Sequence, residues 1–73
     1  MKEDILEMIH EINEYEDFDE ETDLFENDIL DSLTLVMLIG QMEEKFGIFI
    51  PEEVVSVKNF STVNAMVSVI ESL

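Results

Sequence analysis

The chain has 73 residues with no cysteine and one histidine, and its formal net charge at pH 7 is −16. A chain this short forms a single small core, so we expect one domain, residues 1–73, without disulfides, thiolate metal sites or a cysteine nucleophile. The charge argues against binding to nucleic acid or to an anionic membrane surface, and it favours protein partners that carry basic patches.

Apolar residues at helical spacing predict a first helix over residues 3–14. The members of this stripe are Ile5, Met8, Ile9 and Ile12. An acidic stretch over residues 15–28 follows, and its lack of a sustained period predicts a long first loop. We expect this part of the chain to pack through its apolar side chains, with Leu24, Ile29 and Leu30 as the deepest anchors.

A second helix is predicted from Asp31 or Ser32, which are favoured N-caps, to Phe46, just before Gly47. The side chains on its core face are Leu35, Leu38, Ile39, Met42 and Phe46. A second apolar set lies away from that face, beside Gly40, and consists of Leu33, Val36 and Met37. A helix that is apolar on more than one face is either central in the fold or offers its second face to a partner.

The rest of the chain predicts an extended segment, a short helix and a longer final helix. Residues 48–51 are expected to be extended because Pro51 restricts the residue before it. Residues 52–59 are expected to form a short helix or turn, and Ser61 or Thr62 should cap the last helix. The apolar stripe of that helix is Val63, Met66, Val67 and Ile70. Together these elements predict an all-α four-helix bundle with three longer helices, one short helix and a long first loop.

Catalysis and metal binding find little support in the sequence. His10 is expected to be a partly exposed helical residue without a neighbouring nucleophile, so we do not expect an enzyme. The carboxylates that alternate in the first loop, as they do in calcium loops, are Asp17, Asp19 and Glu21. Thr22, however, stands where an EF-hand requires glycine, and Asp28 where it requires glutamate. We therefore interpret the loop as a solvated run of charge and predict no metal site.

Ser32 lies where the first loop turns into the second helix, and two interpretations are open. The first is a helix N-cap, which serine commonly provides. The second is a hydroxyl that carries a modification, because a phosphate attached there would meet the free amides and the positive end of the helix dipole.

The run Asp31-Ser32-Leu33 resembles the Asp-Ser-Leu motif of acyl carrier proteins, whose serine carries 4′-phosphopantetheine. The resemblance covers essentially the whole chain, and it continues in order through residues 24–30, 36–47, 48–51 and 60–63. It implies an acyl-carrier-like helical bundle in which Ser32 bears a covalent 4′-phosphopantetheine derived from coenzyme A. It also implies that the protein has no catalytic activity of its own.

The same resemblance implies roles for the residues around Ser32. Asp31 would help a transferase and its magnesium to engage the serine. The positions that would face partner enzymes are Leu33, Val36, Gly40, Glu43 and Glu44. Met37 and Thr34 stand where fatty-acid members carry acids, so we add Met37 to a partner face that is more apolar than theirs. The run Leu30-Asp31-Ser32 is similar to that of D-alanyl carrier proteins.

We therefore expect an acyl carrier protein that moves thioester intermediates between enzymes of fatty-acid, polyketide or related biosynthesis. The alternatives are a D-alanyl or other aminoacyl carrier and, in another class, an unmodified acidic helical interaction module. The expected partners are a phosphopantetheinyl transferase, a loading ligase and downstream synthases or transferases with basic patches. No long apolar segment or signal peptide is evident, so we expect a cytoplasmic monomer without membrane insertion. A further hypothesis places a long acyl chain among Leu38, Ile39, Met42 and Val67.

Overall fold

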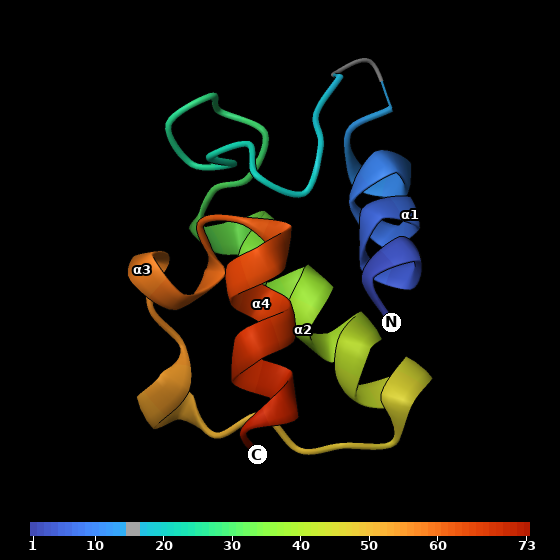
Figure 1. Ribbon diagram of the computed structural model, residues 1–73, viewed down its shortest axis with the longest axis vertical. Helices are drawn as coiled ribbons and strands as arrows, with labels where there is room; N and C mark the ends of the chain where they lie inside the picture. The colour runs from blue at the N-terminus through green and yellow to red at the C-terminus, as the bar shows by residue number, and fades with distance from the viewer. Residues whose placement is uncertain (15–16) are drawn as a thin grey trace.

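The computed structural model describes residues 1–14 and 17–73, and all regular structure within them is helical. The elements are α1 (Lys2–Ile12), α2 (Ser32–Phe46), the 3₁₀ turn η1 (Glu52–Val54), α3 (Val57–Phe60) and α4 (Val63–Glu71). Helix α1 packs against α2 and α4, and α3 packs against α4, which crosses in front of α2 in Figure 1. The all-α bundle with three longer helices and one short helix is confirmed. The first two residues of the predicted acidic loop, 15 and 16, lie outside the described residues.

The helix boundaries follow local capping chemistry. Helix α1 ends at Ile12, two residues before the predicted end, because Asn13 leaves the helical region with φ −139°. Helix α2 ends as predicted at Phe46, where Gly47 takes the left-handed conformation with φ 63° that favours glycine. The backbone N–H of Gly47 donates to the carbonyl of Glu43 and so closes the helix.

The segment predicted as one short element over residues 52–59 is divided into η1 and α3. The division arises at Ser56, whose backbone is extended and whose hydroxyl accepts a hydrogen bond from the N–H of Asn59 at 3.1 Å. A serine that caps a new helix start ends the preceding turn. Thr62, and not Ser61, caps α4, because its hydroxyl accepts from the N–H of Ala65 at 3.0 Å.

One apolar cluster fills the space between the helices and the first loop. The side chains of Leu38, Met42 and Phe60 are fully buried, and Ile39 and Phe46, predicted for the same face of α2, are half-buried. The predicted loop anchors are confirmed, since all of them are buried: Leu24, Ile29 and Leu30. The loop therefore belongs to the core and does not simply span the gap between two helices.

Backbone hydrogen bonds also fasten the first loop to the start of α4. The N–H of Leu24 donates to the carbonyl of Ser61 at 2.7 Å, and the N–H of Asn64 donates to the carbonyl of Glu20 at 3.1 Å. The Glu20 carboxylate pairs with Lys2 of α1 at 2.7 Å. Because the end of this loop leads directly into α2, these contacts fix where α2 begins.

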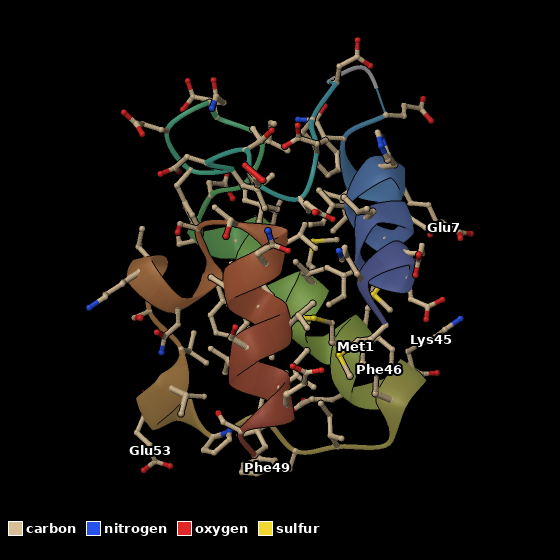
Figure 2. All side chains as sticks on the ribbon, viewed as in Figure 1. Met1, Glu7, Lys45, Phe46, Phe49 and Glu53 are labelled. Carbon is tan, nitrogen blue, oxygen red and sulfur yellow. The ribbon has the colours of Figure 1, made fainter. Side chains whose placement is uncertain are left out.

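The surface is strongly acidic, and the labelled carboxylates of Glu7 and Glu53 point outward in Figure 2. The basic side chain of Lys45 also lies at the surface. Only three of the 73 residues are lysine or arginine. Within the described part of the chain, every helix is too short or too polar to cross a membrane.

We expect the melting temperature to rise when salt is added from low ionic strength. The radius of gyration is 11.0 Å. The Debye length is about 30 Å at 0.01 M salt and about 8 Å at 0.15 M, so screening begins to act within the molecule over this range. Self-repulsion at a charge of −16 destabilises the compact state, whereas the exposed ion pairs that salt weakens contribute little. Thermal unfolding followed by circular dichroism in a NaCl series tests this, and a flat or falling melting temperature would contradict it.

Candidate functional site

The start of α2 is held by a reciprocal pair of hydrogen bonds between Asp31 and Thr34. Oδ1 of Asp31 accepts from the N–H of Thr34 at 2.9 Å, and Oγ1 of Thr34 accepts from the N–H of Asp31 at 2.8 Å. This capping box satisfies helix donors that would otherwise lack partners. Asp31 is therefore the N-cap, and the interpretation of Ser32 as the cap is wrong.

Ser32 is the first residue of α2, and its side chain is exposed to solvent. Because the cap is formed by Asp31 and Thr34, the Ser32 hydroxyl is left at the surface beside the positive end of the helix dipole. A phosphate ester at this hydroxyl would be close to the first amides of α2, which favour anions. The position therefore fits a group attached through a phosphodiester.

Thr34 is a residue whose role the sequence analysis did not assign. It was noted only as a departure from an acid, yet its hydroxyl completes the capping box. The pattern of a good N-cap at Asp31 followed three residues later by a hydrogen-bonding side chain was the available signal. That pattern favours Asp31 over Ser32 as the cap.

The capping box also lowers the pKa of the Asp31 carboxyl below its ordinary value of 3.8, first through the hydrogen bond from the Thr34 N–H and then through that from the Thr34 hydroxyl. A carboxyl whose pKa is lowered by folding stabilises the folded state above its unfolded pKa, and this contribution is lost as the pH falls through the folded value. We therefore expect Asp31→Asn to be less stable than the wild type at neutral pH. The difference should shrink as the pH is taken below about 4.

This expectation is checked by urea unfolding of both proteins across the pH series. Asparagine is itself a good N-cap, so the comparison isolates the charge of the carboxylate from the capping geometry. The other acidic groups titrate in both proteins and cancel in the difference. A difference that stays constant with pH would refute the role of the charge.

The apolar residues predicted to face partners form one exposed stripe along α2. Leu33 is 71% exposed, Val36 66% and Met37 51%. Gly40 continues the stripe, and a β-carbon placed there would meet nothing within 4 Å. The second apolar face of α2 is therefore uncovered in this chain, and α2 is not enclosed at the centre of the fold.

The two acidic positions predicted for recognition differ in their surroundings. Glu44 is exposed, whereas Glu43 is half-buried. Oε2 of Glu43 accepts a hydrogen bond from the N–H of Ile50 at 2.8 Å, which ties the segment after α2 back to the helix. The structure thus gives Glu43 an internal contact that sequence spacing did not predict.

An open groove of about 610 Å³ runs between α2 and the segment that follows it. Val36, Ile39 and Glu43 line it on the α2 side. The opposite wall consists of Phe49, Ile50, Glu52 and Val55. Phe49 is 76% exposed and was not predicted as a surface residue of interest. The alternation of side chains in an extended Ile-Phe-Ile segment was the signal that could have found it.

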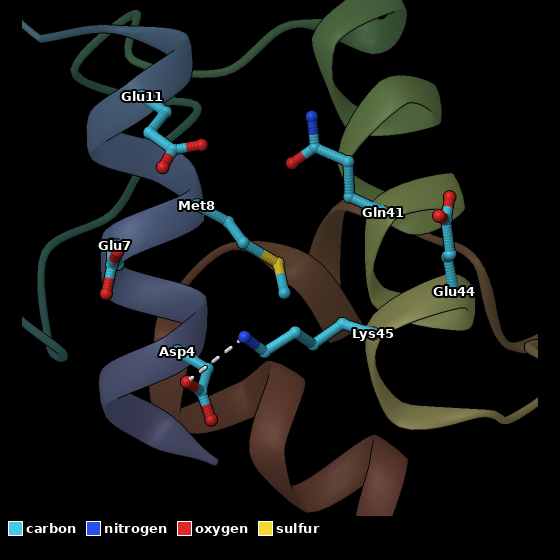
Figure 3. A pocket seen from close by; sticks show the side chains of 7 residues that line it. All are labelled: Asp4, Glu7, Met8, Glu11, Gln41, Glu44 and Lys45. Carbon is cyan, nitrogen blue, oxygen red and sulfur yellow. Dashed lines mark ion pairs between the residues drawn. The ribbon is translucent and has the colours of Figure 1, made fainter.

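A second groove of about 320 Å³ lies between α1 and α2 and is shown in Figure 3. Met8 points into it, and Lys45 reaches across from α2 to the Asp4 carboxylate at 3.9 Å. Its first residue on α2, Gln41, is about two and a half turns from Ser32. This groove is therefore separate from the start of α2.

The first loop shows no convergence of metal ligands in the described residues, where no three acidic or histidine side chains gather around a common point. The Asp19 carboxylate instead forms a local turn, and its pKa is lowered by the hydrogen bond from the Glu21 N–H and then by the Thr22 hydroxyl. His10 is exposed and stacks on Phe18 with 4.4 Å between ring centroids.

Comparisons with known proteins identify related carrier proteins. The family model described as "Phosphopantetheine attachment site" matches residues 3–70. Curated relatives include the D-alanyl carrier proteins of Lactococcus lactis subsp. cremoris strains MG1363 and SK11, which are 38% identical over 66 residues, covering 88% of this chain and 84% of each relative. The D-alanyl carrier protein of Lactococcus lactis subsp. lactis strain IL1403 is 36% identical over the same length. No solved structure matches the chain. The chain therefore belongs to the phosphopantetheine carrier protein family, whose members bear a covalently attached 4′-phosphopantetheine.

Proposed function

We propose that this chain is an aminoacyl carrier whose 4′-phosphopantetheine is attached to Ser32, with D-alanine as the first candidate for the cargo. The observation that carries the proposal is the exposed Ser32 hydroxyl at the start of a helix that is capped by its neighbours. We also propose that residues 1–73 form one carrier domain without catalytic activity, and that partner enzymes perform every chemical step.

The residues around Ser32 would position the arm and keep it accessible. The capping box of Asp31 and Thr34 fixes the first turn of α2, and the helix amides favour the phosphodiester. When bound, the arm supplies a thiol that holds the cargo as a thioester. The chain contributes no thiol of its own, since it has no cysteine.

Two observations support an aminoacyl cargo over a long acyl chain. The Leu30-Asp31-Ser32 run is similar to D-alanyl carriers, and the curated relatives bear that name. In addition, Leu38 and Met42, which would have to separate to admit an acyl chain, are fully buried. A tightly packed interior resists the insertion of additional methylenes. A fatty-acyl or polyketide cargo is the alternative.

The partner face proposed for the transferase and the loading ligase is the exposed stripe of α2. It combines the apolar side chains of Leu33, Val36 and Met37 with the carboxylate of Glu44 further along the helix. A partner that fits it presents apolar side chains opposite the first half of α2 and a basic group opposite the second half.

The experiment is intact mass spectrometry in two steps. The protein is first incubated with coenzyme A, magnesium and a broad-specificity phosphopantetheinyl transferase, and a gain of one phosphopantetheine is expected. The product is then incubated with ATP, a D-alanine-activating ligase and D-alanine, and a gain of one alanyl group is expected. No gain in the first step by a folded protein would refute the carrier function. If a fatty-acyl ligase adds an acyl chain to the product and the D-alanine ligase adds nothing, the result would favour the alternative, a fatty-acyl cargo.

The partner face also gives a prediction for Gly40→Ala. The added methyl meets open space in the folded protein, and alanine stabilises a helix interior by up to about 1 kcal/mol relative to glycine. We therefore expect a higher melting temperature together with a higher KM for the transferase, because the methyl stands on the docking surface. A lower melting temperature, or faster loading, would contradict this placement of Gly40.

A further inference from the structure

The groove between α1 and α2 has no part in the proposed attachment of the arm, and one of its ends already holds a cation. Lys45 extends from α2 across the groove, and its ammonium lies 3.9 Å from the Asp4 carboxylate of α1. The side chain of Met8 lies between the two helices beside this ion pair (Figure 3). At this end the chain itself therefore supplies a cation on an apolar stem.

The other end of the groove repeats these walls without the cation. Glu11 follows Asp4 by seven residues on α1, and Gln41 precedes Lys45 by four on α2, so each pair shares one helix face. The exposed side chains of Glu11 and Gln41 point toward each other across the groove in Figure 3. The ion pairs among the described residues use the carboxylates of Asp4 and Glu20, and not that of Glu11.

A guanidinium suits this open end better than an ammonium does. Its planar set of donors can bond the Glu11 carboxylate and the Gln41 amide oxygen at the same time, and it is less strongly hydrated than an ammonium. The methylene stem that carries it would lie against Met8, whose flexible thioether adapts to the shape of its neighbours. The chemistry of the open end therefore selects an arginine side chain.

That arginine has to come from a different protein. The chain contains no arginine, and at a net charge of −16 a second copy of it would be repelled. The groove also adjoins the partner face, because Gln41 follows Met37 by four residues and precedes Glu44 by three. An enzyme docked on the partner face thus reaches the groove by extending over the edge of α2.

We infer that the open end of this groove binds an arginine side chain of the enzyme that loads the cargo, with the guanidinium on Glu11 and Gln41 and its stem on Met8. This inference rests on the proposed function. Gln41 lies nine residues, or about 14 Å along the helix axis, from Ser32. The transferase has to reach the Ser32 hydroxyl itself. The loading ligase acts on the thiol at the far end of the arm, so its contacts extend further along the carrier.

The test measures how the D-alanine-activating ligase loads the full chain carrying its arm, with KM and kcat determined separately. Glu11→Gln removes the groove carboxylate, and Gln41→Lys places a cation of the chain opposite Glu11, as Lys45 stands opposite Asp4. Each substitution is expected to raise the KM for the carrier roughly two- to fivefold, the effect of losing an exposed ion pair, and to leave kcat unchanged. The KM of the transferase should change by less than about twofold.

Two control variants make the same changes of charge outside the groove. Glu3→Gln removes an exposed carboxylate from α1, and Ser68→Lys adds a cation at an exposed position of α4. Both should leave the KM of the ligase within about twofold of the wild-type value. An equal rise in KM for the groove variants and the controls would show that only the overall charge acts, and it would refute the site.

Methyl NMR of the methionines locates the contact directly. When the ligase is added, the Met8 methyl signal should shift, whereas that of Met66, which is fully buried on α4, should not. The shift of Met8 should be lost in Gln41→Lys. A Met8 signal that the ligase leaves unchanged would overturn the inference, even if KM had risen. A failure of the proposed function is distinct, because the wild-type carrier would then gain no alanyl group at all.

Discussion

Replacing Ser32 with alanine is expected to abolish the gain of one phosphopantetheine while leaving the protein folded. The hydroxyl is the proposed point of attachment, and no other atom of that side chain can replace it. The capping hydrogen bonds at the start of α2 belong to Asp31 and Thr34, so they survive the substitution. Because alanine is a good helix former, the free energy of unfolding should change by less than about 0.5 kcal/mol.

The control for this experiment is Ser68→Ala, which removes another exposed serine hydroxyl, on α4. It should be loaded to the same extent as the wild type by intact mass spectrometry. Circular dichroism of both variants should match that of the wild type. Continued loading of folded Ser32→Ala would show that the arm is attached elsewhere in the chain.

Replacing Phe60 with alanine is expected to remove a large part of the stability of the fold. The Phe60 side chain is fully buried at the end of α3, and truncation of a buried phenylalanine costs about 3–5 kcal/mol. A domain of 73 residues has a total stability of roughly 4–11 kcal/mol at typical values per residue. The neighbouring carbonyl of Ser61 accepts from the N–H of Leu24, so the loss of packing at Phe60 should also loosen the first loop.

Phe49→Ala is the matched control, since it removes the same ring from a position that is 76% exposed. Its free energy of unfolding should change by less than about 0.5 kcal/mol. Urea unfolding of both variants, followed by far-ultraviolet circular dichroism, measures the two values. Similar destabilisation by the two substitutions would contradict the burial of Phe60 as the source of stability.

Local patterns in the sequence were sufficient to predict most of the fold. The stripes in α1, α2 and α4 have the period of a helix, and most of their apolar side chains are buried as that period predicts. The loop anchors were also predictable, because Leu24 is one of the few apolar residues in an acidic run. The division at Ser56 was not, since serine both caps helices and occurs in turns, and only the backbone conformation distinguishes these roles.

The candidate site was predicted in part. The sequence identified Asp31 and Ser32 as a pair, but the distribution of the capping hydrogen bonds between Asp31 and Thr34 is a matter of side-chain geometry. The groove between α2 and the segment that follows it could not be predicted, because its two walls come from segments with different conformations. The hydrogen bond from Ile50 to Glu43 that joins these segments spans seven residues and has no sequence period.

At the start of α2, helix capping and the proposed attachment of the arm belong to different residues, and this affects how partner enzymes recognise the carrier. The residues that hold the first turn, Asp31 and Thr34, are not the residue proposed to be modified. Attachment at Ser32 would therefore leave the backbone of the empty and the charged carrier the same at this position. A partner that must distinguish the two forms would have to contact the attached group itself. A partner that contacts only the protein would bind both forms with equal affinity. The order in which successive enzymes act would then depend on the attached arm and the cargo that it carries. The protein surface at the start of α2 would be the same at every step.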